Sequence, residues 1–139
     1  MWEMLIGIIA ALLSGIAVFI SVHTFYATKR DSAYSSFDEA YMMLLTAALE
    51  HPHLRNMEYT KDYKNKFSKE DLIRYEIYAH MCWNFCETIY DKSDKHLIKT
   101  WLSAIYIENQ FHRGWFEENK EEDKFKKEFT NFILKEFPK

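Results

Sequence analysis

The sequence predicts an all-α protein in which a single N-terminal transmembrane helix continues into an antiparallel bundle of about four helices. The chain of 139 residues begins with a long apolar run that carries no charge. Glycine and proline, which interrupt helices, are scarce, with three and two residues. In the rest of the chain, apolar residues recur at steps of three and four, which is the spacing of one helix face.

The predicted membrane segment is the run from Leu5 to Phe25, 21 residues without Asp, Glu, Lys or Arg. A helix of this length spans about 30 Å, which matches the hydrocarbon core of a bilayer. A cleaved signal peptide is the alternative, but it requires a basic start, which is absent, and a small-x-small cleavage site, which the end of the apolar run over 22–26 does not offer. We therefore expect residues 1–28 to form an uncleaved anchor.

The charges beside the anchor predict its orientation. Lys29 and Arg30 follow the apolar run directly, and no basic residue precedes it. Basic residues favour the cytoplasmic side of a membrane, so we expect the N-terminus outside an inner (plasma) membrane. Residues 29–139 are then a cytoplasmic helical domain, in which both cysteines remain reduced.

Small residues lie on one side of the predicted membrane helix. Gly7, Ala11 and Gly15 recur every fourth residue, and Ala10 and Ser14 occupy the adjacent row. Such a strip lets a second helix approach closely, so these five residues are the predicted helix-packing interface. The expected partners are the lipid bilayer and a second copy of the chain or another membrane protein.

The helices after the anchor follow from apolar spacing and from capping residues. Nothing interrupts the first helix before His51-Pro52, where the residue before proline leaves the helical region. The pattern Ser68-x-x-Asp71 and the residues Ser93 and Asp94 are start signals for later helices. The predicted elements are the continuation of the first helix through 29–50, a polar loop over 53–67 with a short helical turn at 52–57, and helices over 68–90, 95–119 and 124–137.

Polar residues interrupt the apolar stripe of the predicted helix 95–119. Glu108, Asn109 and His112 lie between Ile105 and Trp115 on the face expected to be buried. Buried polar groups need partners, so we predict a buried polar network that fixes how the helices pack. Its expected members are Asn84, Glu87, Glu108, Asn109 and His112.

A metal site is the alternative interpretation of the same helices. Glu76 and His80 share one spacing of four residues, and Glu108 and His112 share another. Di-iron bundles use Glu-x-x-His with further carboxylate helices, whereas these two pairs have a spacing of four residues and further carboxylate helices are not evident. Cys82 and Cys86 could bind zinc or copper with His80, but free cysteines are typically small core residues. We therefore expect no cofactor.

The motifs His51-Pro52-His-Leu54-Arg55 and Trp115-Phe116-x-x-Asn119 carry a resemblance to other proteins. With Phe125 and Phe129, they make the chain resemble uncharacterised bacterial proteins that have one N-terminal membrane helix and a small helical domain. The resemblance covers most of the chain. It implies the same architecture and carries over no functional residue.

Three functions from different classes remain open at this point. The first is a non-enzymatic, membrane-tethered helical module that binds another protein or itself, as an accessory or regulatory subunit of a membrane assembly. The second is an oligomeric membrane effector or pore component. The third is a metal-dependent helical enzyme built on the Glu/His pairs. The residues after the membrane segment carry 18 basic and 20 acidic side chains, a formal net charge of −2 that argues against nucleic-acid binding. No nucleophile motif or phosphate-binding loop is present.

Overall fold

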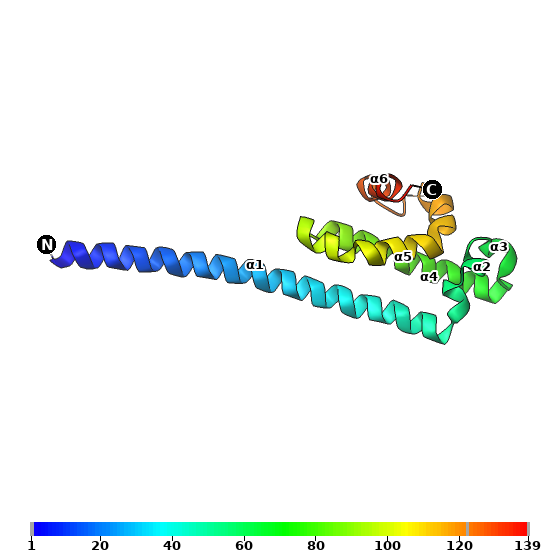
Figure 1. Cartoon of the computed structure of the whole chain (residues 1–139), viewed down its shortest axis with the longest axis horizontal. Coiled ribbons are helices and arrows are strands. Elements are labelled where there is room, and N and C mark those ends of the chain that lie inside the picture. Colours follow the sequence, from blue (N-terminus) through cyan, green and yellow to red (C-terminus); the bar gives the residue numbers. More distant parts are fainter. Residues whose placement is uncertain (1, 122, 139) are drawn as a thin grey trace. The chain divides into compact units, whose positions relative to one another are not determined.

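The computed structural model describes residues 2–121 and 123–138, and these residues are almost entirely helical (Figure 1). This confirms the predicted all-α class. The elements are α1 (Trp2–Glu50), the 3₁₀ helix η1 (Pro52–Arg55), α2 (Met57–Thr60), α3 (Tyr63–Lys66), α4 (Lys69–Lys92), α5 (Lys95–Asn119) and α6 (Lys127–Glu136). The chain divides into two compact units, residues 1–35 and 36–139, each described by itself below.

The first unit consists of the N-terminal part of α1, and its apolar side chains are exposed. Leu12, Phe19 and Phe25 are each more than 60% exposed, in contrast to the core of the second unit. By length and composition, α1 is the one helix among the described residues that could cross a membrane or act as a signal sequence. The expected continuation of this helix to Glu50 is confirmed.

The second unit is built around α4 and α5, which pack side by side (Figure 1). Phe85 lies against Trp101, and Tyr75 lies against His112, so the contacts advance along α4 as they move back along α5. The last turns of α1 join the same core through Tyr41, whose ring stacks on Phe85 at 5.3 Å.

The capping signals explain where the two long helices begin. The Ser68 hydroxyl accepts a hydrogen bond from the backbone N–H of Asp71, and the Asp94 carboxylate accepts bonds from His96 and Leu97. These bonds satisfy amide groups that have no partner inside the first turn. Both starts agree with the sequence-based prediction.

The predicted helical turn at 52–57 is present as η1, but the rest of the predicted loop is wrong in detail, because α2 and α3 occupy most of it. Each helix has only four residues, too short to give a periodic signal. Buried side chains anchor the segment to the core, among them Leu54, Thr60, Tyr63 and Phe67.

The last helix starts later than predicted, at Lys127. Asp123 has a positive φ of 54°, and the backbone at Lys126 is extended. The Glu87 carboxylate accepts a hydrogen bond from the Lys126 backbone N–H at 2.7 Å, which holds this extended residue against α4. Phe125 therefore packs from the connecting segment, ahead of α6.

Candidate functional site

A cluster of polar side chains lies inside the second unit, on the otherwise apolar face of α5. Glu108 and His112 have no exposed surface, and Asn109 is 6% exposed. A spacing of four residues puts Glu108 and His112 on one side of α5, one turn apart. Both side chains point into the region between α5, α4 and the end of α1, as their partners show.

Arg55 and Tyr41 hold one oxygen of the Glu108 carboxylate. The Arg55 guanidinium lies 2.9 Å from Oε1, and the Tyr41 hydroxyl donates to the same atom at 3.1 Å. Burial alone would raise the pKa of Glu108, but the contacts with His112 and Arg55 outweigh it and hold that pKa below its ordinary value. Glu108 is therefore a buried carboxylate with Arg55 as its counter-charge.

His112 is held by the hydroxyl of Tyr75, which lies 3.2 Å from Nδ1. Its second ring nitrogen, Nε2, faces Oε2 of Glu108 at 3.5 Å. Burial lowers the pKa of His112 although the Glu108 carboxylate opposes this shift, so the imidazole is neutral at pH 7. A hydroxyl can donate or accept, so Tyr75 can pair with either tautomer.

Cys82 of α4 completes the cluster. The ligand-type atoms of Cys82, Glu108 and His112 all lie within 4.8 Å of one another, and all three residues are fully buried. Burial and the neighbouring Glu108 carboxylate raise the pKa of the Cys82 thiol, so it is protonated. Cys86, one turn further along α4, is also buried and free but does not belong to this group.

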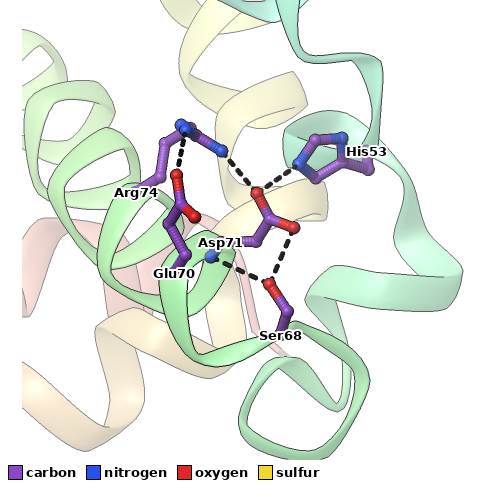
Figure 2. A network of polar contacts seen from close by, with 5 residues as sticks. All are labelled: His53, Ser68, Glu70, Asp71 and Arg74. Carbon is purple, nitrogen blue, oxygen red and sulfur yellow. Dashed lines mark hydrogen bonds and ion pairs between the residues drawn. The ribbon is translucent and has the colours of Figure 1, made fainter.

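A polar network at the start of α4 positions the turn that carries Arg55. Figure 2 shows His53 of η1 directed toward Asp71, which also contacts Arg74 and Ser68. Nε2 of His53 lies 3.5 Å from Oδ1 of Asp71. The Arg55 guanidinium packs over the ring of Phe111 at 4.9 Å. These contacts fix η1 against α4 and α5, so that Arg55 reaches Glu108.

The structure separates the four residues of the predicted metal set. Glu108 and His112 are buried together, whereas Glu76 and His80 are exposed on α4. The His80 ring stacks on Trp115 at 5.7 Å and also contacts Phe125. Among the described residues, the group with metal-ligand spacing uses Cys82 in place of that exposed pair.

The predicted polar network is likewise only partly brought together. Asn84 is exposed, and Glu87 is half-buried beside the start of α6. Asn109 accepts a hydrogen bond from Arg113 at 3.0 Å, on a different set of contacts from Glu108. The network around Glu108 draws instead on Arg55, Tyr41 and Tyr75, which sequence reasoning missed. Tyr41 and Tyr75 occupy apolar positions of the helical pattern, so only their hydroxyl groups indicate a polar contact.

The small-residue strip lies in the first unit, on the exposed part of α1. Ala10, Ala11 and Ser14 are exposed, and the Ser14 hydroxyl donates to the carbonyl of Ala10 at 2.8 Å. A Cβ atom placed on Gly7 or Gly15 would meet no described atom within 4 Å outside the adjoining turns of its own helix. Packing within the described chain therefore does not require glycine at either position.

The described site contains a buried ion pair, a neutral imidazole and a protonated thiol, and these groups determine which chemistry it can perform. Such a set can fix helix packing, and it also holds three atom types that bind metal ions. No family model, curated protein or solved structure matches this chain.

Proposed function

We propose that this protein is a membrane-tethered, non-enzymatic helical module that acts through protein–protein contacts, with a second copy of the chain as its first partner. In this proposal α1 anchors the chain in an inner (plasma) membrane, and residues 29–139 form an antiparallel bundle of about four helices in the cytoplasm. The Gly7, Ala11 and Gly15 strip mediates contact between spans. An accessory or regulatory role in a membrane assembly follows from this arrangement.

One observation carries the proposal: a row of exposed apolar side chains on α4. Ile73, Ile77 and Met81 recur every fourth residue and are 56%, 58% and 47% exposed. Beside them, α4 and the last turns of α1 form an apolar groove of about 260 Å³, lined among others by Met43, Phe85 and Met81. Apolar side chains gathered on one face, with a groove beside them, are typical of a protein-binding surface.

The self-association test uses full-length protein in detergent micelles. We expect sedimentation to give an oligomer that Ile77→Ser and Gly15→Leu each weaken, since one removes apolar contact area and the other blocks close helix approach. Ile107→Ser removes an exposed isoleucine from α5 and is the matched control for the first variant. Leu13→Ile, off the small-residue row, is the control for the second.

A monomeric wild-type chain would overturn self-association as the function of these surfaces. Equal behaviour of a variant and its control would remove the corresponding surface from the proposal. The pore alternative makes a different prediction, namely that the purified oligomer releases dye from liposomes. The module proposed here leaves the liposomes intact.

The proposed orientation gives a second prediction. A reporter that is active only in the cytoplasm, fused after residue 139, should be active, because Lys29 and Arg30 favour that side. Replacing both with glutamine should reduce this activity. The matched control, glutamine at Lys64 and Lys66, removes the same charge far from the span and should have no effect. Activity only from a reporter that works outside the membrane would reverse the orientation.

A further inference from the structure

The atoms at the centre of the buried cluster are directed toward one another. Cys82 comes from α4, and Glu108 and His112 come from α5. Their sulfur, carboxylate and imidazole ligand atoms lie within 4.8 Å of one another. Thiolate, imidazole and carboxylate are the ligand types that zinc binds in proteins, and three such residues are a common number for a site with one position left for solvent.

The inner atoms of the cluster have no hydrogen-bond partner in the described part of the chain. This holds for Oε2 of Glu108 and Nε2 of His112, both on side chains with no exposed surface. The two atoms face each other at 3.5 Å, which is longer than a normal hydrogen bond. An unpaired polar atom in the protein interior is costly, so a partner between these atoms would stabilise the site.

The other polar atom of each of these two side chains already has a partner in the described chain. Oε1 of Glu108 contacts Arg55 and Tyr41, and Nδ1 of His112 contacts the Tyr75 hydroxyl. Metal-binding histidines and carboxylates typically have their other polar atom fixed in this way by neighbouring groups. The neighbours here orient both side chains so that Nε2 and Oε2 point inward.

We propose that Cys82, Glu108 and His112 bind one zinc ion between α4 and α5. Binding releases the Cys82 thiol proton to solvent, and the resulting thiolate forms a bond to the ion together with Nε2 and Oε2. The thiolate and the carboxylate offset the two charges of Zn²⁺, and the Arg55 guanidinium then leaves the cluster with one net positive charge. Arg55 and Tyr41 remain on Oε1, and a water molecule completes the tetrahedral coordination.

The test measures cobalt binding by the full-length chain in detergent, because Co²⁺ replaces Zn²⁺ and reports a bound thiolate through a charge-transfer absorption band. We expect one Co²⁺ per chain with this band in the wild type, and loss of the band when one equivalent of Zn²⁺ is added. Cys82→Ala should abolish the band. Cys86→Ala is the matched control, since Cys86 is equally buried on the same helix, and it should keep full occupancy.

The wild-type spectrum decides the proposal even if a variant fails to fold. A wild-type chain that takes up no cobalt, or takes it up without the thiolate band, overturns the site and leaves a metal-free polar network. Binding that survives unchanged in Cys82→Ala also overturns it. Loss of the band in both cysteine variants counts against it as well, because Cys86 is not one of the ligands.

Discussion

Replacing Glu108 with alanine is expected to destabilise the second unit by about 3 kcal/mol, because the change leaves the Arg55 guanidinium without its counter-charge. The value lies at the low end for a broken buried ion pair, since the Arg55 side chain is 14% exposed and keeps some hydration. Tyr41 also loses its hydrogen-bond acceptor. The measurement is urea unfolding in detergent, followed by tryptophan fluorescence and performed after chelation so that no metal contributes.

Glu108→Gln separates charge from hydrogen bonding. The guanidinium charge is no longer neutralised, but the amide oxygen can still accept hydrogen bonds from Arg55 and Tyr41. The expected loss of stability is therefore smaller than for alanine. In the double variant Arg55→Met with Glu108→Gln, no buried charge remains unpaired. The double variant should therefore lose clearly less stability than the sum of what the two single variants lose. Additive losses would show that Arg55 and Glu108 do not act as a pair.

The pairing of Arg55 with Glu108 marks the limit of what the sequence can predict. The polar interruption at Glu108 and His112 was visible, because it broke an apolar stripe with a period of 3.6 residues. The partner was not visible, because Arg55 lies in a short turn that no periodic pattern connects to α5. A pairing of this kind depends on where η1 folds back against α4, where His53 contacts Asp71 (Figure 2) and Leu54 is buried.

Local sequence signals predicted the boundaries of the helices more accurately than they predicted the contacts between helices. Ser68 and Asp94 cap their helices as expected, and His51 before Pro52 ends α1. Capping depends on residues two or three apart, which the sequence displays directly. The start of α6 depends instead on Glu87 holding the backbone of Lys126, a contact from another helix, and the predicted start was accordingly wrong.

Trp83→Ala is expected to have the largest effect on the core, with a loss of about 3–5 kcal/mol. Trp83 has no exposed surface, and its ring stacks on Phe116 of α5 at 4.2 Å and meets Phe129 of α6 at 6.3 Å. Its indole N–H also donates to the carbonyl of His112 at 3.1 Å. One side chain therefore joins α4, α5 and α6.

The loss of stability should differ between the helices, and amide hydrogen exchange can measure it in each helix. α6 has ten residues, too few to be stable as an isolated helix, so its protection depends on docking through Phe129 and Ile133. Trp83→Ala should reduce amide protection in α6 more than in α4.

Trp83→Phe keeps an aromatic ring against Phe116 and should cost roughly half as much stability as Trp83→Ala. Ile107→Ala, at a residue of α5 that is 39% exposed, should cost clearly less than Trp83→Ala. If Trp83→Ala left α6 as protected as in the wild type, α6 would have to be held by contacts other than this ring.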